Sequence, residues 1–482
     1  MNNTMPPSFL QAITPVIVLV VLLFINMLHF DDALGGANQT ALIIAATVCC
    51  LIGWSNKVKW QDIQQHINRM ILSAMGAILI LFLIGALSGA WMISGIIPMM
   101  IYYGIELMHP SFLLVASVLI CSVVSLATGS SWSTVATMGV AIIGVGNAFG
   151  LNTGLVAGAI ISGAYFGDKM SPLSDTTNLA PAIAGTDLFT HIRYMIYTTG
   201  PAWLVTLVIF GVIGLFQSGN VTENEMAFIR QGIASHFNTS PFLLLTPLIL
   251  IAIIVRKTPA IPAMLAGTVL GILSALLFQS QLLDHFITAE GFSGKYQVLM
   301  QSVFGTMHMH TGVPEVDDLL ATNGMTGMLS TVFLILSAMI FGGAMDACGF
   351  LNRITSALIS RIHSRTSLIG STLLTCILFN ITACDQYLSI VVPGKMLQKL
   401  YAEKGYKPEV LSRALEDSGT VTSVLVPWNS CGATQAKVLG VETLAYLPYC
   451  FFNLLSPLVN LTLTALNFKI RKIINSNTSI QI

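Results

Sequence analysis

Apolar residues form long runs along the whole of this 482-residue chain. A run of about 20 apolar residues in a helix crosses the hydrocarbon core of a bilayer. The lengths of the apolar runs and the polar residues that separate them predict eight conventional spanning helices. They cover residues 10–29, 39–55, 70–92, 194–217, 240–256, 258–279, 326–346 and 441–467. The first run has no Lys or Arg before it, so we expect a retained span and not a cleaved signal peptide.

Two stretches do not fit this pattern. Residues 111–190 and 366–440 contain shorter apolar pieces, interrupted by small and polar residues. The interruptions read "ATGSSWST" and "GDKMSPLSDTTN" in the first stretch, and "ITACDQYLS" and "TSVLVPWNSCGA" in the second. We interpret each stretch as a re-entrant hairpin (111–149 and 366–398) followed by a broken spanning helix (153–190 and 408–440). The predicted fold is an all-α polytopic membrane protein with about 10 spanning helices, two of them broken, plus the two hairpins.

The two stretches have the same internal spacing, which suggests a repeat. Ser131 precedes Asp175 by 44 positions, and Asp385 precedes Asn429 by the same number. We therefore predict two inverted repeats, a common design of secondary transporters. The predicted parts are a first repeat at 1–217, an external connector at 218–239, a second repeat at 240–467 and a basic cytoplasmic tail at 468–482.

Charge is scarce and unevenly placed. The chain is 54% hydrophobic and 9% charged, with a formal net charge of zero, which indicates an integral membrane protein and no nucleic-acid partner. Lys and Arg favour cytoplasmic loops. With a cytoplasmic N-terminus and the two hairpins, most Lys and Arg fall inside, both termini are cytoplasmic, and the loop 280–325 is external. The expected location is the bacterial cytoplasmic (inner) membrane.

Several patterns of soluble chemistry are missing or weak. The eight cysteines lie in or beside apolar segments and form no C-x-x-C pair, so neither a disulfide framework nor a metal site follows from them. "HMH" at 308–310, with Glu315 and Asp317, resembles a metal cluster but lacks helical spacing. "GSSWS" at 129–133 lacks the G-x-S-x-G elbow of a hydrolase. We expect no enzyme activity, no cofactor and no metal other than a transported ion.

The predicted helix breaks offer oxygen ligands. Pro172 and Pro427 lack an N–H donor, so both helices should break there. Backbone that is not helical at membrane depth needs partners from protein, water or a bound ligand. Freed carbonyls with nearby hydroxyl and amide groups suit an alkali cation better than a soft metal. The predicted ligands are Ser131, Ser171, Ser174, Thr176, Asn178, Thr382, Asn429 and Ser430.

Carboxylates at membrane depth are costly and are functional-site hypotheses by default. The candidates are Asp168 and Asp175 in the first break, Asp385 at the second hairpin tip and Asp417 before the second break, with Lys169 as charge partner. One carboxylate can bind either Na⁺ or a proton through the same oxygens, which is the minimum machinery for antiport. We predict that Na⁺ and H⁺ compete at Asp175 and Asp385, with Asp168 and Asp417 as charge partners.

Each candidate also has a structural interpretation. Asp168 and Lys169 could pair with other helices, and Asp175 could cap a restarted helix. Asp346 and Glu416 are secondary candidates. Asp346 could lie near the inner surface, and a structural role is favoured for Glu416 over a functional one.

The motifs at the hairpin tips and helix breaks resemble those of a known family. "GSSWSTVATMGVAIIGVG" and "AGAIISGAYFGDKMSPLSDTTNLAPAIAGTDLFTHI" resemble the signature of the NhaC family of sodium/proton antiporters, which includes malate/lactate relatives. "ITACDQYLSIVVPGKM" and "VPWNSCGA" extend the resemblance to most of the chain. It implies the ion-transporter fold with inverted repeats, and an elevator-like movement against a dimeric scaffold. The family motif falls on Asp168, Lys169, Ser171, Asp175, Thr176, Thr177 and Asn178.

We therefore predict a homodimeric Na⁺/H⁺ antiporter whose partners are Na⁺, H⁺ and the lipid bilayer. The alternative is a Na⁺- or H⁺-coupled antiporter of small organic solutes, such as malate and lactate, amino acids or amines. Lys169 is the only Lys expected at membrane depth, and no Arg is expected there. This weakens a dicarboxylate substrate and leaves amino acids and amines open. A passive channel is disfavoured because polar residues cluster at breaks and do not line a continuous stripe.

Overall fold

The computed structural model describes residues 5–30, 35–217, 223–256, 258–308, 317, 320, 322–359, 362 and 364–473. Within these residues the regular structure is helical, with two isolated β-bridges and no strand. Seven described helices are long and apolar enough to cross a membrane, or nine if each of two bent pairs is one span. The prediction of an all-α membrane protein is confirmed.

The eight predicted conventional spans all fall on helices. Six are single helices: α1 (Phe9–His29), α2 (Ala37–Ser55), α3 (Trp60–Ile93), α10 (Leu188–Leu215), α13 (Ala260–Phe278) and α17 (Leu329–Ala347). The other two are bent. Span 240–256 is η3 (Pro241–Leu244) with α12 (Leu245–Val255), and span 441–467 is α23 (Thr443–Tyr446), η7 (Leu447–Tyr449) and α24 (Phe451–Ala465). The second of these bends by 52°.

The two connecting regions contain helices that the sequence analysis left as loops. The predicted connector 218–239 holds the whole of α11 (Glu223–His236), and the chain bends by 88° between α11 and the segment formed by η3 and α12. The predicted loop 280–325 holds α14 (Ser280–Glu290) and α15 (Lys295–Phe304). Most of the "HMH" motif, from Met309 to Glu315, lies outside the described residues. The described part of the chain holds no cluster of three His, Cys, Asp or Glu side chains suited to a metal.

The first unusual stretch contains two interrupted segments. The predicted hairpin consists of α5 (Pro110–Thr128), α6 (Ser131–Thr134), the π-helix η2 (Val135–Gly139) and α7 (Val140–Ala148). Gly129 ends α5 with a φ of 69°, a left-handed conformation that glycine adopts without strain. The predicted broken helix consists of α8 (Thr153–Met170) and α9 (Asp175–Ala184). Because α5 alone is long enough to cross a membrane, re-entrance of this hairpin remains a prediction.

The second stretch also holds a hairpin followed by an interrupted helix, but its π-helix lies in the interrupted helix and not in the hairpin. Its hairpin consists of α19 (Arg365–Thr382) and α20 (Gln386–Glu403). Its broken helix consists of α21 (Pro408–Leu415), the π-helix η5 (Glu416–Thr420), η6 (Ser423–Leu425) and α22 (Ser430–Leu439). Both proline positions therefore coincide with interruptions, Pro172 between α8 and α9 and Pro427 between η6 and α22.

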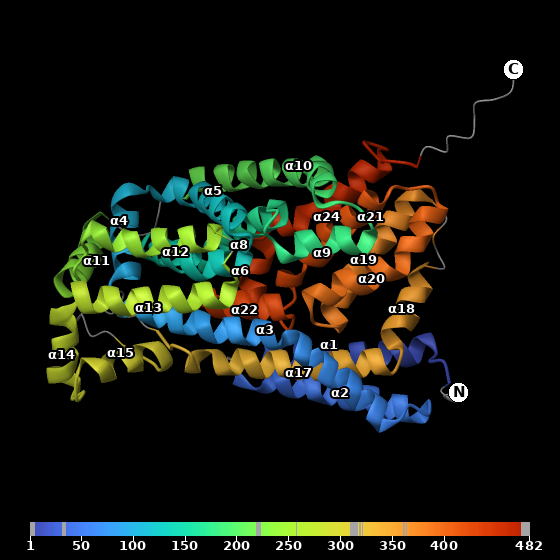
Figure 1. The fold of residues 1–482 in the computed structure, drawn as a ribbon, viewed down its shortest axis with the longest axis horizontal. Helices are drawn as coiled ribbons and strands as arrows, with labels where there is room; N and C mark the ends of the chain where they lie inside the picture. Colours follow the sequence, from blue (N-terminus) through green and yellow to red (C-terminus); the bar gives the residue numbers. More distant parts are fainter. Residues whose placement is uncertain are drawn as a thin grey trace, which may run out of the picture.

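Helix packing repeats in the same way between the two halves. In the first half α10 packs against α5, and in the second half α24 packs against α19. Across the halves, α13 packs against α3 and α2 packs against α17, while α3 and α17 contact each other. Figure 1 shows α1, α2, α3, α13 and α17 on one side of the molecule, and the interrupted segments on the other side or between. This reciprocal packing is what an internal repeat predicts.

Glycines let the first hairpin lie directly on the first broken helix. A Cβ atom at Gly163 of α8 would lie 2.4 Å from the carbonyl oxygen of Val118 in α5. A Cβ at Gly167, one turn later, would lie 2.4 Å from the carbonyl oxygen of Ser122. Small residues four positions apart allow close helix approach in membranes. The α5–α8 contact therefore requires these two glycines.

We predict that Gly163→Ala lowers the melting temperature of the detergent-purified protein. The added methyl group forces α5 and α8 apart, and overpacking of this kind costs about 1–3 kcal/mol. The control is Gly200→Ala in α10, where a Cβ atom meets nothing within 4 Å. This control should be neutral or slightly stabilising because alanine favours helix. Equal melting temperatures for the two variants would contradict the close packing.

Candidate ion-binding site

The break between α8 and α9 is held by hydrogen bonds from its own side chains. The hydroxyl of Ser174 caps α9 by accepting from the N–H of Thr177 at 3.5 Å, and Thr177 donates its own hydroxyl to the carbonyl of Lys169 at 3.0 Å. The amide of Asn178 donates to the carbonyls of Pro172 and Ser174, at 2.9 and 2.7 Å. The break is thus stable without a ligand on these carbonyls, although each carbonyl oxygen retains a second lone pair.

Two further predicted ligands in this break also make local contacts. The buried Ser171 hydroxyl accepts from the N–H of Leu173 at 3.2 Å. The Thr176 hydroxyl lies 3.2 Å from the hydroxyl of Ser174 and is also buried. These hydroxyl groups therefore have protein partners in the break.

Asp175 differs from its neighbours in having no such contact. It is the first residue of α9, and Ser174 and not Asp175 is the N-cap. The capping interpretation of Asp175 is therefore wrong. The side chain is exposed, and it makes no hydrogen bond or ion pair with a described residue. A carboxylate in the first turn is stabilised by the helix dipole, so Asp175 presents a negative charge that is available to a cation.

Asp168 joins the broken helix to the first hairpin tip. Its carboxylate oxygen Oδ2 accepts from the backbone N–H of Ser131 at 3.0 Å and from the Ser131 hydroxyl at 2.7 Å. Both residues are buried. Asp168 therefore satisfies the free N–H at the start of α6, and the hydroxyl of Ser131 is engaged as a donor.

Lys169 and Asp417 form an ion pair with no exposed surface on either side chain. The Asp417 carboxylate also accepts from Thr198 and Ser456, both at 3.2 Å, and from the amide of Asn460 at 2.7 Å. Lys169 donates to Ser456 as well, at 2.9 Å. A buried pair is stable only when its remaining donors and acceptors are satisfied. Here α8, η5, α10 and α24 all contribute, so the pair ties the two broken helices together.

Two charged residues that precede Asp417 in the chain, Arg413 and Glu416, are more deeply buried than their sequence context indicated. Arg413, one of the positive charges assigned to the cytoplasmic side, is fully buried, 3.4 Å from the side-chain oxygen of Asn460 and 4.2 Å from the Tyr194 ring centre. Glu416 is fully buried in η5. The Thr420 hydroxyl interacts with it, but neither carboxylate oxygen makes a hydrogen bond of normal geometry with a described residue. A buried carboxylate with so little compensation is costly, so Glu416 is a stronger functional candidate than its sequence context suggested.

The second hairpin tip rests on the start of α22. Asp385 caps α20 by accepting from the N–H of Leu388 at 2.9 Å, and its side chain is buried. The carbonyl of Cys384 accepts from the backbone N–H of Ser430 at 3.1 Å. Asn429 caps α22 and donates its amide to the Asn380 carbonyl at 3.1 Å. The predicted residues Asp385, Asn429 and Ser430 therefore lie at one junction.

Asn380 is a central residue that the sequence analysis missed. Its amide donates to the Gly419 carbonyl at 2.9 Å and to the Thr422 hydroxyl at 3.0 Å, so it fastens α19 to η5 and to the backbone that follows η5. Asn380 could have been recognised in the sequence as a single amide side chain within an apolar run, because such residues form hydrogen bonds between helices in membranes. Thr382, in contrast, donates its hydroxyl to the Leu378 carbonyl of its own helix at 2.6 Å.

Electrostatic interactions link the carboxylates of the two halves. Asp168 interacts with Asp175, and the hydroxyl of Tyr387 in α20 interacts with Asp168, Asp175 and Asp385. Glu416 in turn interacts with Asp168 and Asp417. Asp168, Asp175, Glu416 and Asp417 therefore form one group of neighbouring acids at the two breaks, and Asp385 at the second hairpin tip approaches this group through Tyr387.

Asp346 lies outside this group. Its carboxylate lies 2.7 Å from Nδ1 of His66, within hydrogen-bond distance, and both side chains are about one-third exposed. His66 is in the second turn of α3, and Asp346 is near the end of α17. The structure thus places this secondary candidate with the scaffold helices and gives it a local partner.

The sequence matches known transporters over most of its length. The profile described as the Na⁺/H⁺ antiporter family matches residues 163–468. The "Na(+)/H(+) antiporter NhaC" of Alkalihalophilus pseudofirmus is 35% identical over 420 residues, which is 87% of this chain and 88% of that protein. The "Malate-2H(+)/Na(+)-lactate antiporter" of Bacillus subtilis is 36% identical and covers 92% of both chains.

A third relative has a different named substrate. The "Arginine/ornithine antiporter ArcD" of Halobacterium salinarum is 34% identical over 94% of this chain and 91% of its own length. The region matched by the family profile, residues 163–468, contains both breaks, the second hairpin and the Lys169–Asp417 pair. The expected resemblance to NhaC antiporters is confirmed, and this multi-pass membrane protein belongs to the Na⁺/H⁺ antiporter family.

Proposed function

We propose that this chain exchanges Na⁺ for H⁺ across the bacterial cytoplasmic membrane, with both termini in the cytoplasm. The observation that carries the proposal is the exposed, unpartnered carboxylate of Asp175 at a helix break in an apolar bundle. Membership of the Na⁺/H⁺ antiporter family supports the identity of the two ions.

In this proposal Na⁺ and H⁺ compete at Asp175 and Asp385. The two residues come from opposite halves and both interact with Tyr387. Either ion neutralises one negative charge, and an empty, charged site is costly to move through a medium of low dielectric constant. The site therefore crosses the membrane when it carries Na⁺ or H⁺ and not when it is empty. This restriction couples the two ions. Glu416 adds a second buried carboxylate that can hold a proton.

The first test is Asp175→Asn, which keeps the size of the side chain and removes its charge. We expect Na⁺-dependent proton movement in proteoliposomes to fall to the level of empty vesicles, because the amide neither releases a proton nor neutralises Na⁺. The matched control is Asp284→Asn, an exposed carboxylate of α14 that pairs with Lys295. Normal antiport by a correctly inserted Asp175→Asn protein would remove Asp175 from the mechanism.

We further propose that the two broken helices move as one transport unit, in an elevator-like manner, against a scaffold that dimerises. The Lys169–Asp417 pair supports a single unit because it joins α8 to η5. The mutual packing of α2, α3, α13 and α17 supports a separate scaffold. The reciprocal packing of the two halves supports the inverted repeats on which such movements rest.

The role of the pair predicts a large stability effect. Lys169→Met should destabilise the detergent-purified protein by about 3–5 kcal/mol, because Asp417 is left as a buried uncompensated charge. The double variant Lys169→Met, Asp417→Leu should recover part of this loss. The control is Lys399→Met, since Lys399 pairs with Glu403 on the surface, where such pairs contribute at most about 1 kcal/mol. Equal melting temperatures for Lys169→Met and the control would contradict the role of the pair.

Exchange of a small organic solute is the second candidate function. Relatives named for malate and lactate and for arginine and ornithine are about as similar to this chain as the NhaC relative. The positive charge of Lys169 is already neutralised by Asp417. Arg413, however, is a buried cation that the sequence analysis did not expect, with Nε and Nη1 unpaired among the described residues. A carboxylate solute would therefore find its counter-charge at Arg413.

A thermal-shift screen separates the two candidates. Because a ligand stabilises the folded state it binds, Na⁺ and Li⁺ should raise the melting temperature in the absence of any organic solute. Malate, lactate, arginine and ornithine should have no effect without Na⁺. The Asp175→Asn variant should lose the response to Na⁺. Stabilisation by an organic solute, with none by Na⁺ alone, would reverse the ranking.

A further inference from the structure

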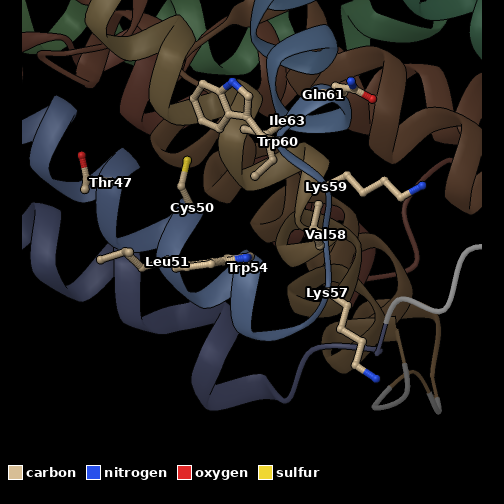
Figure 2. A pocket seen from close by; sticks show the side chains of 10 residues that line it. All are labelled: Thr47, Cys50, Leu51, Trp54, Lys57, Val58, Lys59, Trp60, Gln61 and Ile63. Atoms are coloured by element: carbon tan, nitrogen blue, oxygen red, sulfur yellow. The ribbon is translucent and has the colours of Figure 1, made fainter.

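A cavity of about 840 Å³ lies away from the ion site, where α2 ends and α3 begins. Figure 2 shows how its lining is arranged. One wall is a stripe on α2 formed by Thr47, Cys50, Leu51 and Trp54, which occupy positions i, i+3, i+4 and i+7 and so share one helix face. Lys57 and Lys59 extend from the connecting loop, and Trp60 opens α3.

The apolar side of the cavity is strongly exposed. Trp54 has 75% of its surface accessible, Trp60 has 62% and Leu51 has 57%. α2 qualifies as a membrane span over Ala37–Ser55, so its last turn lies where the hydrocarbon core meets the headgroups. Tryptophan is enriched at this level because its ring is apolar and its N–H is polar. The exposed rings therefore face lipid and not bulk water.

The polar side of the cavity is positively charged. Neither Lys57 nor Lys59 forms an ion pair with a described residue, and the nearest acid in the sequence is Asp62. Lys57 has a φ of 64°, in the left-handed region that strongly favours glycine. A lysine therefore occupies a position where the backbone conformation favours glycine. Its ammonium group is attracted to anionic headgroups at the membrane surface.

We propose that this cavity binds an anionic diacyl phospholipid. Its phosphate is attracted by the positive charges of Lys57 and Lys59, and the upper part of one acyl chain packs against Leu51, Trp54 and Trp60. The volume falls within the usual range of small-molecule sites, which is about 300–1,000 Å³. Because α2 packs against α17, the bound lipid stabilises the helices that form the scaffold of this protein.

The test compares melting temperatures of the full-length protein in mixed micelles that contain phosphatidylglycerol or phosphatidylcholine. Phosphatidylglycerol should raise the melting temperature, and phosphatidylcholine should not. The double variant Lys57→Gln, Lys59→Gln should lose most of the phosphatidylglycerol shift. The matched control Lys395→Gln, Lys399→Gln removes the same charge from the exposed face of α20 and should keep the shift. Inorganic phosphate should cause no shift, because it lacks the acyl chains.

A single variant separates lipid binding from damage to the fold. Lys57→Gly relieves the left-handed backbone, so its melting temperature in phosphatidylcholine should equal or exceed that of the wild type. The same variant should lose part of the phosphatidylglycerol shift. The proposal fails if the double lysine variant keeps the full shift or if the α20 control loses as much of it. It also fails if inorganic phosphate alone reproduces the shift, or if the cavity is covered by a second copy of the chain in a dimer that excludes lipid.

Discussion

The buried ion pair between Lys169 and Asp417 fixes how the rest of the site is arranged. Charges at membrane depth are tolerated when each one has a partner and its remaining hydrogen-bond sites are filled. Thr198, Ser456 and Asn460 fill those of Asp417. The pair therefore neutralises itself and fastens the first broken helix to the second. It leaves the other acids of the group as the ones able to respond to an ion.

The carboxylates around the breaks consequently have different roles. Asp168 holds the first hairpin tip through Ser131, and Asp385 caps the helix at the second tip. Asp175 alone among these aspartates is exposed without a protein partner in the described structure. Hydrogen bonds within each break hold the interrupted backbone in place. An exchanger of two small cations needs such a site, because both loaded forms must fit the same moving unit.

Much of this arrangement follows from the sequence, and the rest depends on contacts between distant segments. Apolar length gave the eight conventional spans, and the absence of an N–H in Pro172 and Pro427 located both interruptions. The partner of Lys169 lies 248 positions away, which no local pattern reveals. The burial of Arg413 could not be predicted either, because the distribution of positive charge indicates the side of the membrane and does not identify a cation covered by neighbouring helices. The alternative of a capping role for Asp175 was wrong by one residue, because Ser and Asp are both good N-cap residues and Ser174 is the one that caps α9.

Uptake of radioactive Na⁺ into proteoliposomes tests the central claim most directly. The purified protein is reconstituted in vesicles with an acidic interior, and no organic solute is present on either side. The account predicts that the outward proton gradient drives Na⁺ accumulation above its external concentration. A protonophore that collapses the gradient should abolish the accumulation. Absence of Na⁺ accumulation until malate, lactate, arginine or ornithine is supplied would contradict the account and identify an organic-solute exchanger.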